Sequence, residues 1–155
     1  MSKERELSER IRRHIPLAET MQIAVERLAP TEVVLSAPLA PNVNDKGCAF
    51  GGSIVSLLTL AGWALLREAV AGGEDAEIYV VDSRIEYLRP VYETLRAHAR
   101  FPAELDGAAA ARRFREQGRV KLSVLAELRL ADGTTACRLE GRFAAFGAER
   151  DRGPR

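Results

Sequence analysis

The chain has 155 residues, of which 23 are Lys or Arg and 22 are Asp or Glu, so its formal net charge is +1. This length suits one domain with a single core, and the even balance of charge provides no field that would attract nucleic acid or an anionic membrane. Aromatic residues make up 6% of the chain, too few for a surface on which single-stranded bases stack. Neither nucleic acid nor a membrane is therefore expected as a partner.

The two cysteines, Cys48 and Cys137, lie outside any CxxC pair or Cys/His cluster. We therefore expect no metal site and no disulfide framework. Residues 1–14 are charged throughout and lack the apolar segment of a secretory signal. The expected location is the cytoplasm.

Periodicity predicts the first elements of the chain. Within residues 1–14, Leu7 and Ile11 are spaced by four among Glu and Arg side chains, which predicts an amphipathic N-terminal helix that Pro16 stops. Residues 21–25 and 33–38 alternate apolar and polar side chains around a Pro-containing break. They predict two strands joined by a turn.

A long apolar segment follows a loop that is rich in Gly, Pro and Asn, residues 38–52. Residues 51–71 carry only two charges and are apolar on every side, which predicts a helix of roughly 19 residues. A membrane span is the alternative, but glycines and hydroxyls interrupt the segment and its flanks carry no anchors. A helix of this kind is more typical of one enclosed by protein.

The second half of the chain alternates in the manner of strands, with an Asp-Gly turn at 132–133. Four strands in antiparallel succession are predicted, at residues 77–88, 94–101, 119–130 and 135–146, before a frayed tail at 147–155. A sheet with one buried face needs a cover, and residues 51–71 form the only long apolar helix available. The predicted fold is one α+β domain over residues 1–155, an antiparallel sheet wrapped around one long central helix.

Two segments carry a resemblance to known families. The sequence NDKGCAFGG at 44–52 resembles the N-x-x-G-x-x-H-G-G signature of the phenylacetyl-CoA-type acyl-CoA thioesterases, with Phe50 in place of the His, and VDSRIEYLRP at 81–90 resembles their V-D-x-x-I-x-Y-x-x-P strand. The segment PLAPNVNDKG-x-x-FGGS followed by TLAGW is more closely similar to the thioesterase-like C-terminal domain of the YiiD acetyltransferase fusions. The resemblance implies the hotdog fold from about residue 15 onward and activity as an acyl thioesterase on acyl-CoA or acyl-carrier-protein thioesters.

The resemblance and the residues together indicate the catalytic groups. Gly51 and Gly52 begin the helix, where free N–H groups and the positive end of the helix dipole would stabilise an oxyanion, although they would also simply permit a tight turn. Asn44 falls on the family's Asn, which holds the substrate carbonyl or the attacking water; alternatively it caps the loop. Thr59 falls where the family has an acid, nine residues after Phe50, and a hydroxyl can orient a water but cannot act as its base.

The general base or nucleophile is expected to be Asp45, in a loop where other hotdog thioesterases carry a catalytic Asp; a surface-loop Asp is the alternative. Asp82 would face the helix entrance or, as the favoured reading, be buried and bonded by backbone N–H groups. The Ser53 hydroxyl is expected to bond backbone N–H groups near the helix start. The residues expected to bind substrate are Phe50, Ser53, Asp82, Ser83 and Arg119.

Basic residues gather before the strand at 119–130, namely Arg112, Arg113, Arg115, Arg119 and Lys121. They form either a solvated stretch or a site for the CoA phosphates or an acidic acyl carrier protein. Coenzyme A or phosphopantetheine would enter only as part of the substrate, and no separate cofactor is expected.

Two functions from different classes remain open. One is hydrolysis of acyl thioesters, and the other is a non-hydrolytic acyl-thioester binding module that accompanies an acyltransferase in fatty-acid metabolism. A single curled sheet would leave the site half open, so we expect a homodimer or a dimer of dimers in which the strands at 76–88 pair edge to edge.

Overall fold

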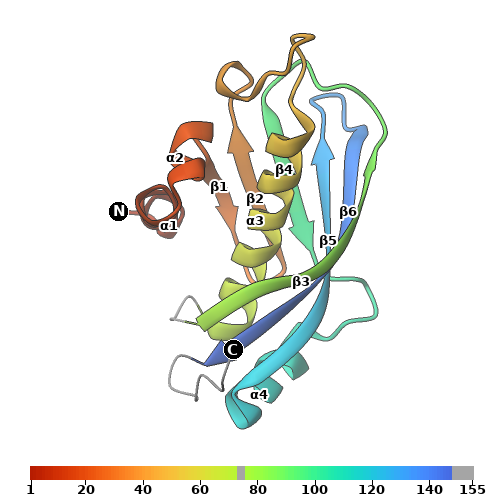
Figure 1. The fold of residues 1–155 in the computed structure, drawn as a ribbon. Coiled ribbons are helices and arrows are strands. Elements are labelled where there is room, and N and C mark those ends of the chain that lie inside the picture. The colour runs from red at the N-terminus through yellow and green to blue at the C-terminus, as the bar shows by residue number, and fades with distance from the viewer. Residues whose placement is uncertain (73–75, 148–155) are drawn as a thin grey trace.

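The computed structural model describes residues 1–72 and 76–147, and Figure 1 shows its helices and strands. The helices are α1 (Lys3–His14), α2 (Pro16–Met21), α3 (Gly51–Ala71) and α4 (Gly107–Gln117), with a short 3₁₀ turn, η1 (Ala40–Asn42). The strands are β1 (Ala24–Leu28), β2 (Glu32–Ala37), β3 (Ala76–Tyr87), β4 (Leu95–Arg100), β5 (Arg119–Arg129) and β6 (Thr135–Gly147). The predicted frayed tail lies outside the described residues, except for Gly147, which ends β6.

The six strands form one antiparallel sheet in the order β1-β2-β4-β5-β6-β3. The prediction of four consecutive neighbouring strands is wrong for β3, which pairs with β6 at one edge of the sheet, with Tyr87 opposite Cys137. The connection between β3 and β4 explains the difference. It contains Pro90 and bonds to other parts of the chain, with the N–H groups of Leu88 and Arg89 donating to the Ala136 carbonyl, so it is no hairpin turn.

Helix α3 fills the concave face of the sheet, as the sequence predicts (Figure 1). It contacts every strand, and four of its leucines are fully buried, at positions 57, 58, 65 and 66. Helix and sheet approach closely at Gly62, where an added Cβ would lie 2.6 Å from the ring of Phe143 on β6. The α+β architecture with a sheet wrapped around one long helix is therefore confirmed.

Helix α3 is long and apolar enough to cross a membrane, but 67% of its most apolar stretch is buried inside the protein. Its two charged residues, Arg67 and Glu68, are also buried, and Glu68 lies 3.6 Å from the Lys3 ammonium of α1. Lys3, the first residue of α1, thus reaches the C-terminal part of α3. The prediction of an enclosed core helix holds.

Two helices were not predicted. Pro16 ends α1 as expected but also starts α2, because its fixed φ and missing N–H suit the first position of a helix; Met21 therefore lies in a helix and β1 begins at Ala24. Helix α4 replaces the predicted link before β5. Asp106 caps it by accepting from two backbone N–H groups, and Gly118 ends it with φ +71°.

Candidate active site

The start of α3 presents free backbone N–H groups. Phe50 occupies the N-cap position and supplies no side-chain cap, while its own N–H donates to the Asn42 carbonyl at 2.7 Å. No acceptor within residues 1–72 and 76–147 takes the N–H groups of Gly51, Gly52 or Ser53. Such a helix end favours a negatively charged or strongly polarised oxygen.

The two glycines leave room for nearby aromatic rings at the helix start. A Cβ on Gly51 would lie 3.4 Å from the ring of Tyr87, and a Cβ on Gly52 would lie 2.4 Å from the ring of Phe50. Phe50 remains 55% exposed. The structure therefore brings three of the predicted residues, Phe50, Gly51 and Gly52, together at the helix start.

Tyr87 joins this group, although the sequence reasoning assigned it no role. It is the last residue of β3, and its hydroxyl donates a hydrogen bond to the Gly51 carbonyl at 3.1 Å. Burial raises the pKa of Tyr87, so the phenol stays protonated and remains a donor. The signal was present in the sequence, because Tyr87 is the Tyr of the strand motif at 81–90.

Asn44 is engaged in shaping the loop before α3. Its side-chain oxygen accepts from the N–H groups of Lys46 at 2.8 Å and Cys48 at 3.2 Å, and its amide nitrogen lies 3.2 Å from the Cys48 sulfur. This arrangement matches the loop-capping alternative for Asn44. In this conformation the side chain orders the loop rather than presenting a free amide to a ligand.

Asp45 lies on the surface of the same loop, where its side chain is 81% exposed and pairs with the Lys46 ammonium at 3.1 Å. Ser53 is half-buried at the helix start, and the structure gives its hydroxyl no hydrogen bond within the described residues, so the expected bond to backbone N–H groups is not formed. Neither side chain is fixed against the free N–H groups of α3.

An apolar cavity of about 450 Å³ lies beside α3, between α2 and β3. Helix α3 lines it with Val55, Ser56, Thr59, Leu60 and Trp63, which share one face at helical spacing. The Ser56 hydroxyl donates to the Gly52 carbonyl at 2.8 Å, so the cavity begins one turn below the helix start. Thr59 therefore lies in the cavity wall, roughly 10 Å along the helix from Gly52.

Asp82 is not buried, so the favoured reading of this residue is wrong. A β-bulge between Val80 and Asp82 turns the carboxylate to the outer face of the sheet, where both its oxygens contact the Arg142 guanidinium. The hydrogen bond from Arg142 holds the pKa of Asp82 below its usual value. The sequence could not place the bulge, and β3 is an edge strand with room for an exposed ion pair.

Ser83 and Arg119 also lie apart from the helix start. Ser83 is exposed in the middle of β3. Arg119 begins β5 and stands opposite Phe146, which in turn stands opposite Glu77 near the beginning of β3. Tyr87 lies ten positions after Glu77 on β3, a span of roughly 33 Å, so Arg119 belongs to the other end of the sheet.

The cysteines are packed rather than reactive. Both Cys48 and Cys137 are free and buried, and burial raises the pKa of Cys137 to about 11, which keeps the thiol neutral. In the part of the chain that the structure describes, no three His, Cys, Asp or Glu side chains group so that they could hold a metal ion.

A six-stranded antiparallel sheet around one apolar helix, with a glycine-rich helix start beside an apolar cavity, is the architecture of the hotdog-fold thioesterases. Residues 4–147 match the family described as "Putative thioesterase (yiiD_Cterm)", and the chain belongs to that family.

Solved structures agree with this assignment. A "putative thioesterase" from Shewanella oneidensis is 28% identical, covers 92% of this chain and 96% of its own, and has a TM-score of 0.80. A protein of unknown function from Chlorobaculum tepidum is 24% identical over 93% of this chain and 94% of its own, with a TM-score of 0.79. A thioesterase from Haemophilus influenzae shares the fold at 16% identity, covering 99% of this chain and 96% of its own with a TM-score of 0.71.

Proposed function

We propose that this chain hydrolyses acyl thioesters of coenzyme A or of acyl carrier protein. The observation that carries the proposal is that the free N–H groups of Gly51, Gly52 and Ser53 lie about one helical turn from an apolar cavity of about 450 Å³ on the same helix. The cavity offers a site for the acyl chain, and the helix start offers a site for the thioester carbonyl.

The chemistry requires that water add to the carbonyl carbon. The tetrahedral intermediate carries its negative charge on the former carbonyl oxygen, and the N–H groups at the start of α3 are placed to stabilise it. The C–S bond then breaks, the acid product is released, and the thiolate takes up the proton that the water gave to the general base. Tyr87 supports this geometry by holding the Gly51 carbonyl and, with it, the first turn of the helix.

Asp45 is the proposed general base, because it is the carboxylate of the loop that leads into α3. Its ion pair with Lys46 is fully exposed and therefore weak, so the carboxylate is free to turn toward a bound substrate. Thr59 is proposed to orient the water or the acyl chain from the cavity wall, since a hydroxyl cannot take its proton at neutral pH.

Steady-state hydrolysis of an acyl-CoA chain-length series and of acyl carrier protein tests the proposal. Asp45→Asn is expected to lower kcat by at least about tenfold, a modest share of general-base effects. Glu104→Gln, at an exposed position before α4, is the matched control and should leave kcat unchanged. An absence of turnover above background for every thioester would contradict the proposal.

A non-hydrolytic binding module is the second candidate, and two observations favour it. Thr59 stands where the resembled enzymes have an acid, and the Asn44 side chain is engaged within its own loop. Acyl-thioester binding at micromolar affinity without turnover, measured by calorimetry, would select this function. Turnover that is lost in Asp45→Asn would exclude it.

We further propose that two copies pair through β3 into a homodimer, alone or as half of a dimer of dimers. β3 is an edge strand of 12 residues whose exposed side chains include Tyr79, Val80 and Val81. Such an edge offers unpaired backbone groups to a second copy. A monomeric mass by light scattering at micromolar concentration would contradict the pairing.

The cytoplasm is the proposed compartment. The support is that both cysteines are free, which suits a reducing environment. Fractionation of cells that express the tagged chain tests the location.

A further inference from the structure

A groove of about 430 Å³ lies on the outer face of the sheet, at the junction of α4, β5 and β6. Its charged lining residues are all cations: Arg113 from α4, and Arg119 and Lys121 from β5. The two β5 residues are exposed and two positions apart, so they point to the same face. No carboxylate within residues 1–72 and 76–147 forms an ion pair with any of the three.

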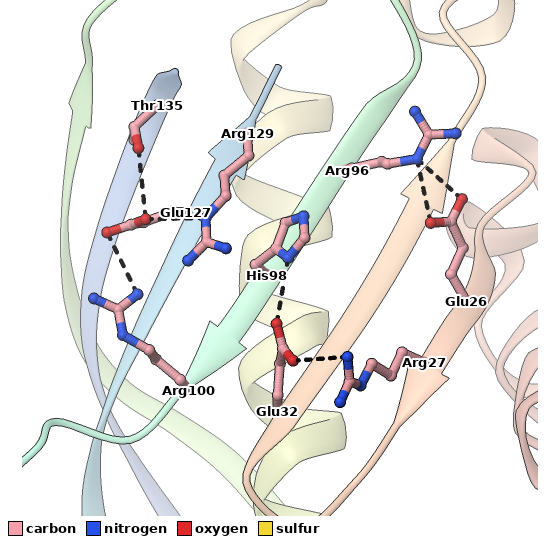
Figure 2. A network of polar contacts seen from close by, with 9 residues as sticks. All are labelled: Glu26, Arg27, Glu32, Arg96, His98, Arg100, Glu127, Arg129 and Thr135. Carbon is pink, nitrogen blue, oxygen red and sulfur yellow. Dashed lines mark hydrogen bonds and ion pairs between the residues drawn. The ribbon is translucent and has the colours of Figure 1, made fainter. Parts of the chain in front are cut away.

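The part of the outer face that Figure 2 shows, over β1, β2, β4 and the C-terminal part of β5, is different. There the basic side chains stand beside carboxylates from other strands of the sheet: Arg96 on β4 donates to Glu26 on β1 at 3.2 Å, and Arg100 on β4 lies 3.5 Å from Glu127 on β5. Arg27, Arg129, Arg138 and Arg142 also have acidic partners. The groove is thus a place where positive charge on this face is left for an external anion.

An exposed aromatic residue, Phe146, lines the groove, and a second aromatic residue lies beside it. Phe146 is 39% exposed, and Tyr79 stands beside Phe146 with ring centroids 6.2 Å apart. Glu77, which faces Phe146 across the sheet, accepts a hydrogen bond from the Tyr79 hydroxyl at 3.3 Å. A flat aromatic surface beside Arg and Lys suits a ligand that has both a base to stack and phosphates to bind.

We propose that this groove binds the phosphorylated adenosine end of coenzyme A, with Arg113, Arg119 and Lys121 on the phosphates and Phe146 under the base. The proposal rests on the proposed function, because it assigns the nucleotide half of that substrate. It commits to a nucleotide rather than to the acidic surface of a carrier protein, because a carrier protein has no base to place on the exposed aromatic pair.

The groove serves the helix start of a second copy. Within one chain the two lie at opposite ends of β3, roughly 33 Å apart. Two β3 strands that pair antiparallel about their middle place the Ala76 end of each beside the Tyr87 end of the other. The thioester would then lie at one chain's Gly51 while its nucleotide lies on the other chain.

Calorimetric titration with adenosine 3′,5′-bisphosphate, coenzyme A and dephospho-coenzyme A tests the site without any turnover. Arg119→Glu should weaken bisphosphate binding by about tenfold or more, as loss of a charge-assisted contact does. Arg13→Glu is the matched control, because it makes the same charge change at an exposed position of α1 outside the groove, and it should bind as the wild type does. Circular dichroism confirms that both variants are folded.

The wild type should also bind coenzyme A about tenfold more tightly than dephospho-coenzyme A, and Arg119→Glu should abolish this difference. Equal binding of the two ligands by the wild type, or unchanged binding by Arg119→Glu, would overturn the proposal. The proposal would also be overturned if the bisphosphate does not bind the wild type while Arg119→Glu loses the binding of acyl carrier protein. If the bisphosphate binds as expected and no thioester is hydrolysed, the proposed function fails and the nucleotide site stands.

Mixed dimers test the placement across two copies. Arg119→Glu chains and chains with a blocked helix start, Gly52→Val, are each expected to be impaired in acyl-CoA hydrolysis. After unfolding and refolding together in equal amounts, they should recover about a quarter of wild-type activity, because half of the dimers then contain one intact site of two. No recovery above the separate variants would overturn the placement.

Discussion

Gly62→Ala probes the closest approach between the central helix and the sheet. The new Cβ would lie 2.6 Å from Cζ and 2.9 Å from Cε2 of Phe143, whereas ordinary carbon contacts are about 3.5–4.0 Å. Because Phe143 is 1% exposed, the ring or the helix must shift by about 1 Å. Overpacking costs about 1–3 kcal/mol, and the higher helix propensity of Ala returns about 1 kcal/mol. The free energy of unfolding should therefore fall by about 1 kcal/mol.

Urea unfolding monitored by circular dichroism measures this change, and Phe143→Leu supplies the second arm of a double-mutant cycle. In the Phe143→Leu background the ring is gone, so Gly62→Ala should become neutral or stabilising by up to about 1 kcal/mol. If Gly62→Ala alone raises the stability of the wild type by about 1 kcal/mol, helix propensity acts unopposed. The close packing of α3 on β6 would then be refuted.

Three further variants test the site and the core. Gly52→Ala should change the free energy of unfolding by no more than about 0.5 kcal/mol, because the exposed Phe50 ring can swing away from the new Cβ. The same variant should lower kcat/KM for acyl-CoA. A loss of stability that accounts for the loss of kcat/KM would contradict this prediction. Tyr87→Phe removes the hydrogen bond to the Gly51 carbonyl and should lower the free energy of unfolding by about 0.5–1.5 kcal/mol in a urea titration. Cys137 has a pKa of about 11 in the fold against 9.0 as its ordinary value, so the unfolded thiol ionises first as the pH rises. Stability should therefore be unaffected below pH 9 and fall by up to about 1.4 kcal/mol per pH unit between pH 9 and 11, and Cys137→Ala should remove that part of the slope.

The core of the fold could be predicted because its signals are local. Residues 51–71 are apolar all round, and the structure has a helix over the same residues. Alternation with a period of two placed β5 and β6 to within one residue at each end. From these elements the enclosure of the helix followed, since nothing else in the chain could cover the sheet.

The order of strands could not be predicted because periodicity identifies the faces of a strand and not its neighbours. β3 reads as a strand in sequence, yet its position at the edge depends on the long connection through Pro90. The error at Asp82 has the same origin. An Asp within an apolar strand favours a prediction of burial among N–H donors, but an edge strand with a bulge leaves it exposed beside Arg142.

The candidate site was predictable in its backbone and less so in its side chains. The junction of loop and helix at Gly51 and Gly52 follows from sequence alone, since the two glycines directly precede the long apolar segment, where the first N–H groups of a helix have no partner within it. The partner of that junction, Tyr87, lies 36 residues further on, and only the folded chain brings the two together. Asn44 illustrates the converse, because a motif position does not reveal that neighbouring N–H groups already occupy its oxygen.

The apolar cavity wall is consistent with Thr59 standing where the resembled enzymes have an acid. Thr59 lies among apolar side chains such as Val55, Leu60 and Trp63, and an ionised carboxylate there would be costly without a partner. A hydroxyl at this position keeps the wall compatible with an acyl chain along the whole face of α3. For the proposed hydrolysis, we therefore expect water activation by a carboxylate that reaches the helix start from outside the cavity, and the loop before α3 carries one in Asp45.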